Sequence, residues 1–136
     1  MKSYLRRINV RTSHPVELIN VTGDVRRVVE ESGVRNGVAV VFSLHTTLAV
    51  YVNEDEGRLR RDLLNLLEKL APKGAGYLHD EIDRNAHSHL RSILLNPSVT
   101  IPVADGSLLI GTWQSIFLAE FDGPRRRSYV VQVIGE

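Results

Sequence analysis

The first part of the chain carries strand-like and helical patterns of apolar residues in turn. Residues 5–12 alternate apolar and polar side chains with one slip, which predicts a β-strand. Three valines then recur at helical spacing and predict a helix that Thr22 caps and Gly33 ends. Two apolar runs follow, 38–42 and 48–52, and each predicts a strand. The first run is so apolar that we expect it to be buried on both faces of a sheet.

The clearest helical pattern occupies residues 55–70, where leucines form one stripe along the predicted helix. The stripe consists of Leu59, Leu63, Leu66, Leu67 and Leu70. A polar loop over residues 77–85 separates this helix from a shorter one over residues 86–95, which Asn96-Pro97 ends. We expect the apolar residues of the shorter helix to form its inner face; they are Ala86, Leu90, Ile93 and Leu94.

The last third of the chain is strand-like. Strands are predicted over residues 98–103, 108–110, 113–121 and 128–133, with turn signals at Asp105-Gly106 and Asp122-Gly123-Pro124. The 136 residues, 43% of them hydrophobic, suit a single domain over residues 1–136 with a core of its own. The pattern therefore predicts an α+β fold in which a mostly antiparallel sheet or sandwich carries two or three helices.

Composition excludes several classes of function. The chain has no cysteine, which rules out disulfides, thiolate metal sites and cysteine nucleophiles and suits a reducing cytoplasm. No apolar run approaches the roughly 20 residues of a membrane span, and the N-terminus lacks a signal-peptide pattern, so the cytoplasm is the expected location. The formal net charge of +1 gives no support for nucleic-acid binding. Arginine greatly outnumbers lysine, which suits either a stable surface or an anionic ligand.

Histidines are the strongest candidates for chemistry, because four of the five fall between positions 45 and 89. His45 lies in a polar break between two apolar runs, where the hydroxyls of Thr46 and Thr47 could orient it or bind an anion. His79 lies in a loop beside acidic residues, and a carboxylate can fix the tautomer of a metal-bound histidine. Each also has a structural interpretation: a core histidine for His45, and an exposed loop histidine for His79.

His87 and His89 come at the start of the predicted shorter helix, where residues two apart diverge by roughly 200°. We therefore expect one of them to point toward the histidine site, and geometry alone leaves open which. Three imidazoles with one open position form the arrangement of a catalytic zinc site. Histidine and carboxylate ligands also suit nickel, manganese or iron. A histidine cluster without metal would instead bind phosphate or transfer protons.

The C-terminal third adds an aromatic and a basic motif. Trp113 stands beside Gln114, so this pair could stack on a ring and bind its edge, although a lone tryptophan also suits the core. In the arginine run that follows the Asp-Gly-Pro turn, alternate residues of a strand share a face, so Arg125 and Arg127 could bind phosphate bidentately. A solvated hairpin or a contact between subunits explains the same run. No Gly-rich phosphate loop or nucleophile elbow is present.

Several segments occur together in an order that matches a known family. They are His45-Thr46-Thr47, Asn53-Glu54, Arg61-Asp62-Leu63-Leu64, Tyr77-Leu78-His79-Asp80, Asn85-Ala86-His87-Ser88-His89-Leu90, Thr100-Ile101-Pro102-Val103 and the stretch from Gly111 to Arg127. On these segments, which span nearly the whole chain, the sequence resembles the YjbQ family, the group named for secondary thiamine-phosphate synthase activity. The combination of HTT, GTWQ and FDGPR makes this resemblance specific.

The resemblance implies a compact α/β domain that assembles as a homotrimer, with sites near subunit boundaries. It also implies a histidine site for a divalent metal, zinc or magnesium above all, with His45, His79 and His89 as ligands and catalytic groups. His89 is chosen over His87 because it directly precedes the Leu-Arg of the family motif. The family name implies that a pyrimidine diphosphate is joined to a thiazole phosphate with release of pyrophosphate. The residues expected to bind these small phosphorylated ligands are Thr46, Thr47, Trp113, Gln114, Arg125 and Arg127.

Two other functions are compatible with the same histidines. One is a metal-dependent hydrolase or phosphatase of unknown substrate, and the other is a non-catalytic protein that senses or stores a metal or an anionic metabolite. Release of pyrophosphate would support the transferase, water-dependent cleavage the hydrolase, and tight binding without product the binding protein. Neither nucleic acid nor a membrane is expected as a partner.

Overall fold

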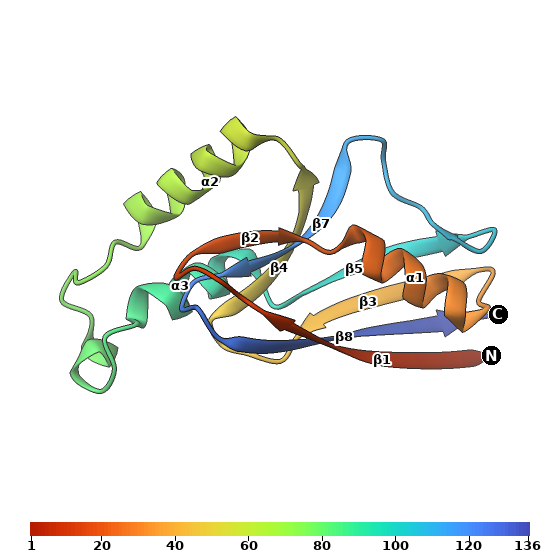
Figure 1. The fold of residues 1–136 in the computed structure, drawn as a ribbon, viewed down its shortest axis with the longest axis horizontal. Coiled ribbons are helices and arrows are strands. Elements are labelled where there is room, and N and C mark those ends of the chain that lie inside the picture. The colour runs from red at the N-terminus through yellow and green to blue at the C-terminus, as the bar shows by residue number, and fades with distance from the viewer.

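Twelve elements make up the structure, a computed structural model that describes all 136 residues. In chain order they are β1 (Lys2–Arg11), β2 (Glu17–Asn20), α1 (Thr22–Ser32), β3 (Gly37–Ser43), β4 (Leu48–Glu54), α2 (Gly57–Leu70), the 3-10 helix η1 (Leu78–Glu81), α3 (Ala86–Leu95), β5 (Ser98–Ala104), β6 (Ser107–Leu108), β7 (Gln114–Glu120) and β8 (Arg126–Gly135) (Figure 1). The strands form a five-stranded sheet of order β1-β8-β3-β5-β6 and a three-stranded sheet of order β2-β7-β4. Neighbouring strands are antiparallel in both sheets, so the predicted α+β fold is confirmed.

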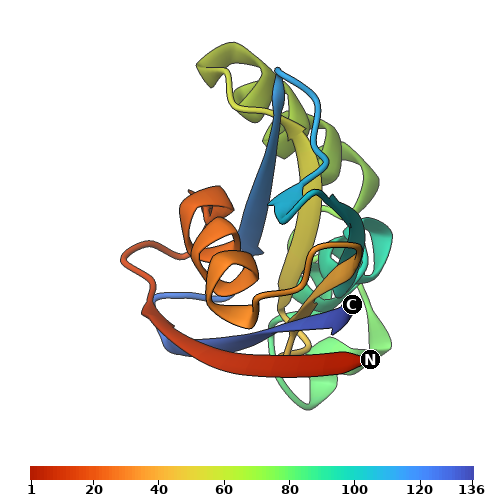
Figure 2. The same ribbon diagram turned by 90° about the vertical axis from the view of Figure 1, so that its right-hand side faces the viewer.

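Helix α1 packs into the main core between the two sheets (Figure 2). The three valines that predicted this helix, Val25, Val28 and Val29, are buried against residues of β3, β4, β7 and β8. Gly33 ends the helix with a φ of 68°, a left-handed conformation that glycine adopts without a steric cost. The prediction that Thr22 caps the helix is wrong. Its hydroxyl instead accepts the N–H of Ile116, which ties the helix to the three-stranded sheet.

One face of the five-stranded sheet is open to solvent. Along β8 the odd-numbered residues from 127 to 135 are buried, whereas the even-numbered residues between them are partly exposed. On β3, Val38 and Phe42 are exposed in the same way. The prediction that this run is buried on both faces is therefore wrong, because α1 and the three-stranded sheet cover only the inner side (Figure 2).

Helix α2 buries little of its leucine stripe. Of its residues only Leu67 is buried, whereas Leu66 and Leu70 are 52% and 60% exposed. Figure 1 shows α2 projecting to one side of the sheets, so that it contacts them along only part of its length. The helix begins two residues later than predicted, after Glu56, whose carboxylate accepts the N–H of Arg58. Several leucines of the predicted core stripe therefore face solvent in a single chain.

Helix α3 has the predicted bounds, but only Ala86 of the predicted inner face is buried. Its buried residues are Ala86, Ser88, Arg91 and Ser92, whereas Leu90, Ile93 and Leu94 are exposed. The reason is that hydrogen bonds dock this helix. The Ser88 hydroxyl donates to Phe121 O at 2.6 Å, and Arg91 Nε donates to Ala71 O at 3.0 Å. A pattern of apolar residues does not contain this information.

Two short elements were missed by the sequence pattern. Strand β2 has four residues and pairs with β7, and η1 lies within the predicted loop over residues 77–85. The turn predicted at Asp105-Gly106 is present, with both residues at positive φ. No helix of this chain is both long enough and apolar enough to cross a membrane.

Candidate functional site

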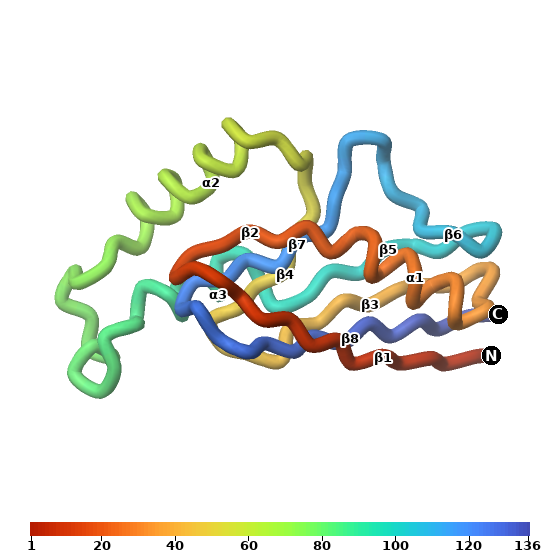
Figure 3. Tube along the Cα trace, viewed as in Figure 1, coloured from red at the N-terminus to blue at the C-terminus, as the bar shows by residue number.

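Except for Gln114, the polar residues expected to carry chemistry gather around the turn that connects β7 to β8, residues 120–127. The N–H of Phe121 donates to Thr47 O, two residues after His45, and Phe121 O accepts the hydroxyl of Ser88. Figure 3 traces β7 into this turn and on into β8 beside α3. The turn therefore joins the loop that carries His45 to the helix that carries His89.

A buried ion pair fixes the two ends of this turn. Glu120 is 0% exposed and Arg127 is 4% exposed. Arg127 donates to the Glu120 carboxylate through Nε and Nη2, and Nη2 also donates to Thr47 Oγ1 at 2.7 Å. Thr12 Oγ1 donates to Glu120 Oε1 at 2.7 Å. Burial raises the pKa of Glu120, but hydrogen bonds from Arg127, Thr12 and the Asp122 N–H outweigh burial and lower that pKa.

The alternation of the arginine run predicted that Arg125 and Arg127 share one face. This prediction is wrong. The guanidinium of Arg127 faces the interior, where its hydrogen bonds go to Glu120 and Thr47. Arg125 precedes β8, is exposed, and pairs with Asp122. Arg126 is the first residue of β8, and its side chain points to the open face of the sheet with the other even-numbered residues of the strand. Thr47 is buried in the same network, and Thr46 is exposed beside it.

A chain of hydrogen bonds runs from the turn to His79. Arg125 donates to Asp122, through Nε to the carbonyl oxygen at 2.7 Å and through Nη2 to Oδ2 at 3.1 Å. The same Oδ2 accepts from Asn85 Nδ2 at 2.9 Å. Asn85 Oδ1 lies 3.0 Å from His79 Nε2. We call Arg125, Asp122, Asn85 and His79, with the neighbouring His89, the histidine network.

The order of this chain determines which ring nitrogen of His79 carries the proton. An ionised carboxylate only accepts, so Asn85 presents its amide nitrogen to Asp122 and its oxygen to His79. His79 Nε2 must then donate, and in the neutral ring Nδ1 remains as an unshared acceptor. Asn85 is buried whereas His79 is exposed. An accessible imidazole in a fixed tautomer is suited to proton transfer or to ligation through Nδ1.

His89, rather than His87, lies against His79. The two rings meet edge to face with their centroids 4.7 Å apart. Asp80 helps to position them, because its Oδ1 accepts the first N–H of α3, that of Ala86, at 3.0 Å. His87 Nδ1 is buried without a hydrogen-bond partner, and burial lowers the pKa of this ring. The spacing of the two histidines left their orientation open, and the structure places His89 in the network.

His45 is bound to the backbone of β8. Its Nε2 accepts the N–H of Ser128 at 2.8 Å, while Leu44 N–H donates to Ser128 O at 3.3 Å. The imidazole thus takes the place of a backbone carbonyl just beyond the end of β3. In the neutral ring Nδ1 carries the proton, so Nε2 is not free to bind a metal ion. Burial lowers the pKa of His45, and the guanidinium group of Arg127 lowers it further.

The three candidate histidines do not form a metal centre within one chain. No group of three or more histidine, aspartate or glutamate side chains is arranged to hold an ion. His79 and His89 are adjacent, but one nitrogen of His79 is bound to Asn85 and one nitrogen of His45 to Ser128. A zinc centre with three protein ligands does not fit the residues of a single chain.

Trp113 and Gln114 lie far from the histidine network. Gln114 begins β7 and Glu120 ends it, which separates them by about 20 Å at 3.3 Å per residue. Trp113 is 74% exposed, so its interpretation as a core residue is wrong. Gln114 Oε1 accepts the N–H of Gly111 at 2.8 Å and closes the loop that precedes the strand. Within one chain these residues are not placed to bind a ligand held by the histidines.

The sequence assigned no role to Asn85 and Asp122 of the histidine network, or to Glu120 of the buried ion pair. Asp122 stands in the FDGPR motif and Asn85 directly precedes α3, so both lie inside the segments that carry the family resemblance. The hydrogen-bonded residues Asn85 and Asp122 are 37 positions apart in the sequence, and Thr12 and Glu120 are 108 positions apart. Spacing along the chain cannot reveal contacts of this kind.

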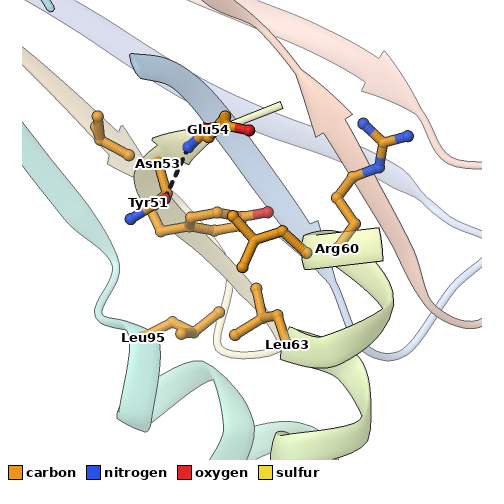
Figure 4. Close-up of a pocket in the computed structure, with 8 residues that line it drawn as sticks. Tyr51, Asn53, Glu54, Arg60, Leu63 and Leu95 are labelled. Atoms are coloured by element: carbon orange, nitrogen blue, oxygen red, sulfur yellow. Dashed lines mark hydrogen bonds between the residues drawn. The ribbon is translucent and has the colours of Figure 1, made fainter. Parts of the chain in front are cut away.

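A separate pocket of about 310 Å³ lies between β4 and α2 (Figure 4). Its lining is Tyr51, Val52, Asn53, Glu54, Leu59, Arg60, Leu63 and Leu95. The ring of Tyr51 stacks on Phe117 with centroids 4.9 Å apart, and burial raises the pKa of Tyr51 to about 12. Arg60 is already paired with Asp55. No histidine lines this pocket, so it is not part of the histidine network.

Comparison with known proteins identifies the relatives of the chain. A family model described as UPF0047 protein YjbQ-like matches residues 6–136. A UPF0047 protein of Methanothermobacter thermautotrophicus is 51% identical over 136 residues, which cover 100% of this chain and 95% of that protein. The UPF0047 protein YugU of Bacillus subtilis is 30% identical, covering 96% of this chain and 99% of the relative.

Solved structures show the same fold. The crystal structure of a YbjQ-like protein of unknown function from Sulfolobus solfataricus superposes with a TM-score of 0.97 at 40% identity, covering 99% of each chain. An uncharacterised conserved protein of the yjbq/upf0047 family from Clostridium acetobutylicum gives a TM-score of 0.90, also at 40% identity. That match covers 95% of this chain and 99% of the other.

Proposed function

The chain belongs to the UPF0047 YjbQ-like family, and we propose that it is an enzyme that acts on a small phosphorylated substrate, with His79 as the proton-transfer group. The observation that carries this proposal is the hydrogen-bond chain Arg125–Asp122–Asn85–His79. A buried amide that orients an exposed imidazole is what general acid–base catalysis requires. A merely exposed loop histidine would need no such chain.

A phosphorylated substrate is favoured by the groups that surround His79. The ring of His89 lies beside it, and Arg125 stands at the other end of the chain with part of its guanidinium exposed. Imidazolium and guanidinium groups donate charge-assisted hydrogen bonds to phosphate oxygens. We assign His79 to proton transfer, His89 to binding of the anion, and His45 to positioning of the turn through Ser128.

Hydrolysis is favoured over condensation on chemical grounds. Cleavage of a phosphate ester or anhydride by water requires a base to take a proton from the water, which an unshared Nδ1 can do. Joining a thiazole phosphate to a pyrimidine diphosphate uses a ring nitrogen with no proton to lose, and mainly requires neutralisation of the departing diphosphate. Thiamine-phosphate synthesis is therefore the second candidate, for which the same cationic groups would hold the diphosphate.

A metal is not required for the proposed proton transfer, and no step is assigned to one. A zinc ion at His79 and His89 would need at least one further ligand that a single chain does not place there. Magnesium prefers carboxylate oxygens and water to imidazole nitrogens. The cytoplasmic location that the lack of cysteine suggests also stays a prediction.

We also propose that copies of the chain assemble, as a homotrimer on the family resemblance. The support is the large amount of exposed apolar surface on the helices. The exposed apolar residues lie on α2, η1 and α3, with one directly after η1. They are Leu59, Leu66, Leu70, Leu78, Ile82, Leu90, Ile93 and Leu94. Exposed apolar side chains in such number mark sites of protein association when they gather on one surface. Because η1 and α3 also carry the histidine network, assembly would bring a neighbouring chain close to it.

The test is a turnover assay on the purified protein. Phosphate monoesters, diphosphates and the pyrimidine diphosphate plus thiazole phosphate pair are offered with a chelator and, separately, with zinc or magnesium. We expect phosphate release that falls at least about 100-fold in His79→Gln. The matched control is His14→Gln, because His14 is exposed and its ring makes no hydrogen bond.

Three results would contradict the hydrolase proposal. Equal activity in His79→Gln and His14→Gln would remove His79 from the chemistry. Formation of the joined product with pyrophosphate, and no phosphate release, would favour the synthase. Tight binding of a phosphorylated ligand without any product would identify a binding protein.

A further inference from the structure

The ends of β1 and β8 form a basic surface that is distinct from the histidine network. Ile8 and Val10 of β1 pack toward the core, so Arg7, Asn9 and Arg11 point to the open face of the sheet. The register places Arg11 directly opposite Arg126, and Asn9 directly opposite Ser128. Both arginines are exposed and both point away from α1.

The arginine pair lacks the counter-charges that neighbouring arginines have. Arg6 is paired with Glu31, Arg125 with Asp122, and Arg127 with Glu120. No carboxylate forms an ion pair with Arg11 or Arg126. Like charges directly opposite each other on adjacent strands destabilise a sheet. An anion bound between the two guanidinium groups would remove this repulsion.

The surface between these residues is hollowed. A pocket of about 530 Å³ is lined by Asn9, Val10, Arg11, Arg126, Arg127 and Ser128, with no acidic residue among them. This volume lies in the range of small-molecule sites, about 300–1,000 Å³. Its floor is ordered by a hydrogen bond from Ser128 Oγ to Asn9 Oδ1 at 2.9 Å. Arg7 reaches the same Ser128 Oγ at 3.4 Å and adds a third cation at the edge.

We propose that this pocket binds a diphosphate group, held between the guanidinium groups of Arg11 and Arg126. Each guanidinium presents a planar fork that matches two oxygens of one phosphate. Two such forks, carried side by side on the same face of adjacent strands, suit two linked phosphates better than a single phosphate. The group can come from inorganic pyrophosphate or from a diphosphate ester, and both share the recognised chemistry.

This site does not rest on the proposed function. It uses none of the side chains of the histidine network. Two links connect the regions: Arg125 directly precedes Arg126, and the N–H of Ser128 donates to His45. Loss of diphosphate binding in Arg126→Gln with intact turnover would separate the two sites. Loss of turnover in His79→Gln with intact diphosphate binding would separate them in the other direction.

The experiment is isothermal titration calorimetry of the intact protein with inorganic pyrophosphate, orthophosphate and adenosine diphosphate. The variants are Arg11→Gln and Arg126→Gln, and the matched control is Arg26→Gln, because Arg26 is exposed on α1 and forms no ion pair. We expect pyrophosphate to bind more tightly than orthophosphate. Its Kd should rise about tenfold or more in each pocket variant and stay unchanged in the control.

The outcomes distinguish the two sources of the diphosphate group, and they distinguish diphosphate binding from a contact between copies of the chain. Binding of adenosine diphosphate as tight as that of pyrophosphate would identify a diphosphate ester as the ligand class, and weaker binding would identify the free anion. Equal pyrophosphate binding in Arg126→Gln and Arg26→Gln would overturn the proposal. A smaller particle mass for Arg126→Gln in light scattering, with pyrophosphate binding unaffected, would also overturn it, because the arginines would then contact another copy of the chain.

Discussion

The buried pair of Glu120 and Arg127 makes a quantitative prediction. In Glu120→Leu the guanidinium of Arg127 stays in the interior with only Thr47 as a hydrogen-bond partner. Removing one partner of a buried ion pair costs about 3–5 kcal/mol, because the remaining charge is uncompensated. The Thr12 hydroxyl adds little to this loss, since it can still donate to Arg125 O. Typical domains are stable by about 5–15 kcal/mol, so the loss is a large part of the total.

The assay is urea unfolding at pH 7, followed for wild type, Glu120→Leu, Arg127→Met and the double variant. We expect each single variant to lose about 3–5 kcal/mol and the double variant to recover most of that loss, because no buried charge remains. Glu31→Gln, which breaks the exposed pair with Arg6, is the control and should leave the midpoint unchanged. A loss below about 1 kcal/mol in Glu120→Leu, as for a surface pair, would refute the reasoning.

Two further predictions concern pH and assembly. Burial and Arg127 lower the pKa of His45 in the folded protein. The stability that His45 contributes is therefore complete above its ordinary pKa near 6.5 and is lost as the pH falls through the lower folded-state pKa. The free energy of unfolding should therefore fall between pH 7 and pH 5, and fall less in His45→Gln; equal slopes would exclude His45 as a cause. Leu66→Gln with Leu70→Gln should lower the particle mass in light scattering without reducing helicity; an unchanged mass would place the subunit contact elsewhere.

The local pattern of apolar residues predicted most of the helices and strands, but not always which face of each is covered by other elements. Helix α1 was predicted with its buried valines, because their helical spacing is a property of the segment alone. The same reasoning assigned the wrong face to α3, where Ser88 and Arg91 dock the helix through hydrogen bonds to distant backbone carbonyls. It also expected β3 to be covered on both sides, although only its inner face meets α1 and the second sheet.

The candidate site was predicted in its parts but not in its connections. The clustering of histidines between positions 45 and 89 drew attention to these segments, and His79 and His89 do lie in contact. The pairing of Asn85 with Asp122, and the inward direction of Arg127, depend on contacts between segments far apart in sequence. Alternation along β8 puts Arg127 on the buried face, whereas Arg125 lies before the strand and is exposed, so the two arginines do not share a face.

The measurement that tests the account most directly is the tautomeric state of the histidine rings, read from long-range ¹H–¹⁵N spectra at pH 8. The hydrogen-bond chain predicts a proton on Nε2 of His79 and on Nδ1 of His45, whereas His14 should show the mixture of an unconstrained ring. In Asn85→Ala, His79 should revert to such a mixture and His45 should not. A proton on Nδ1 of His79 in wild type, or a mixture like that of His14, would contradict the proposal that the network prepares His79 for proton transfer.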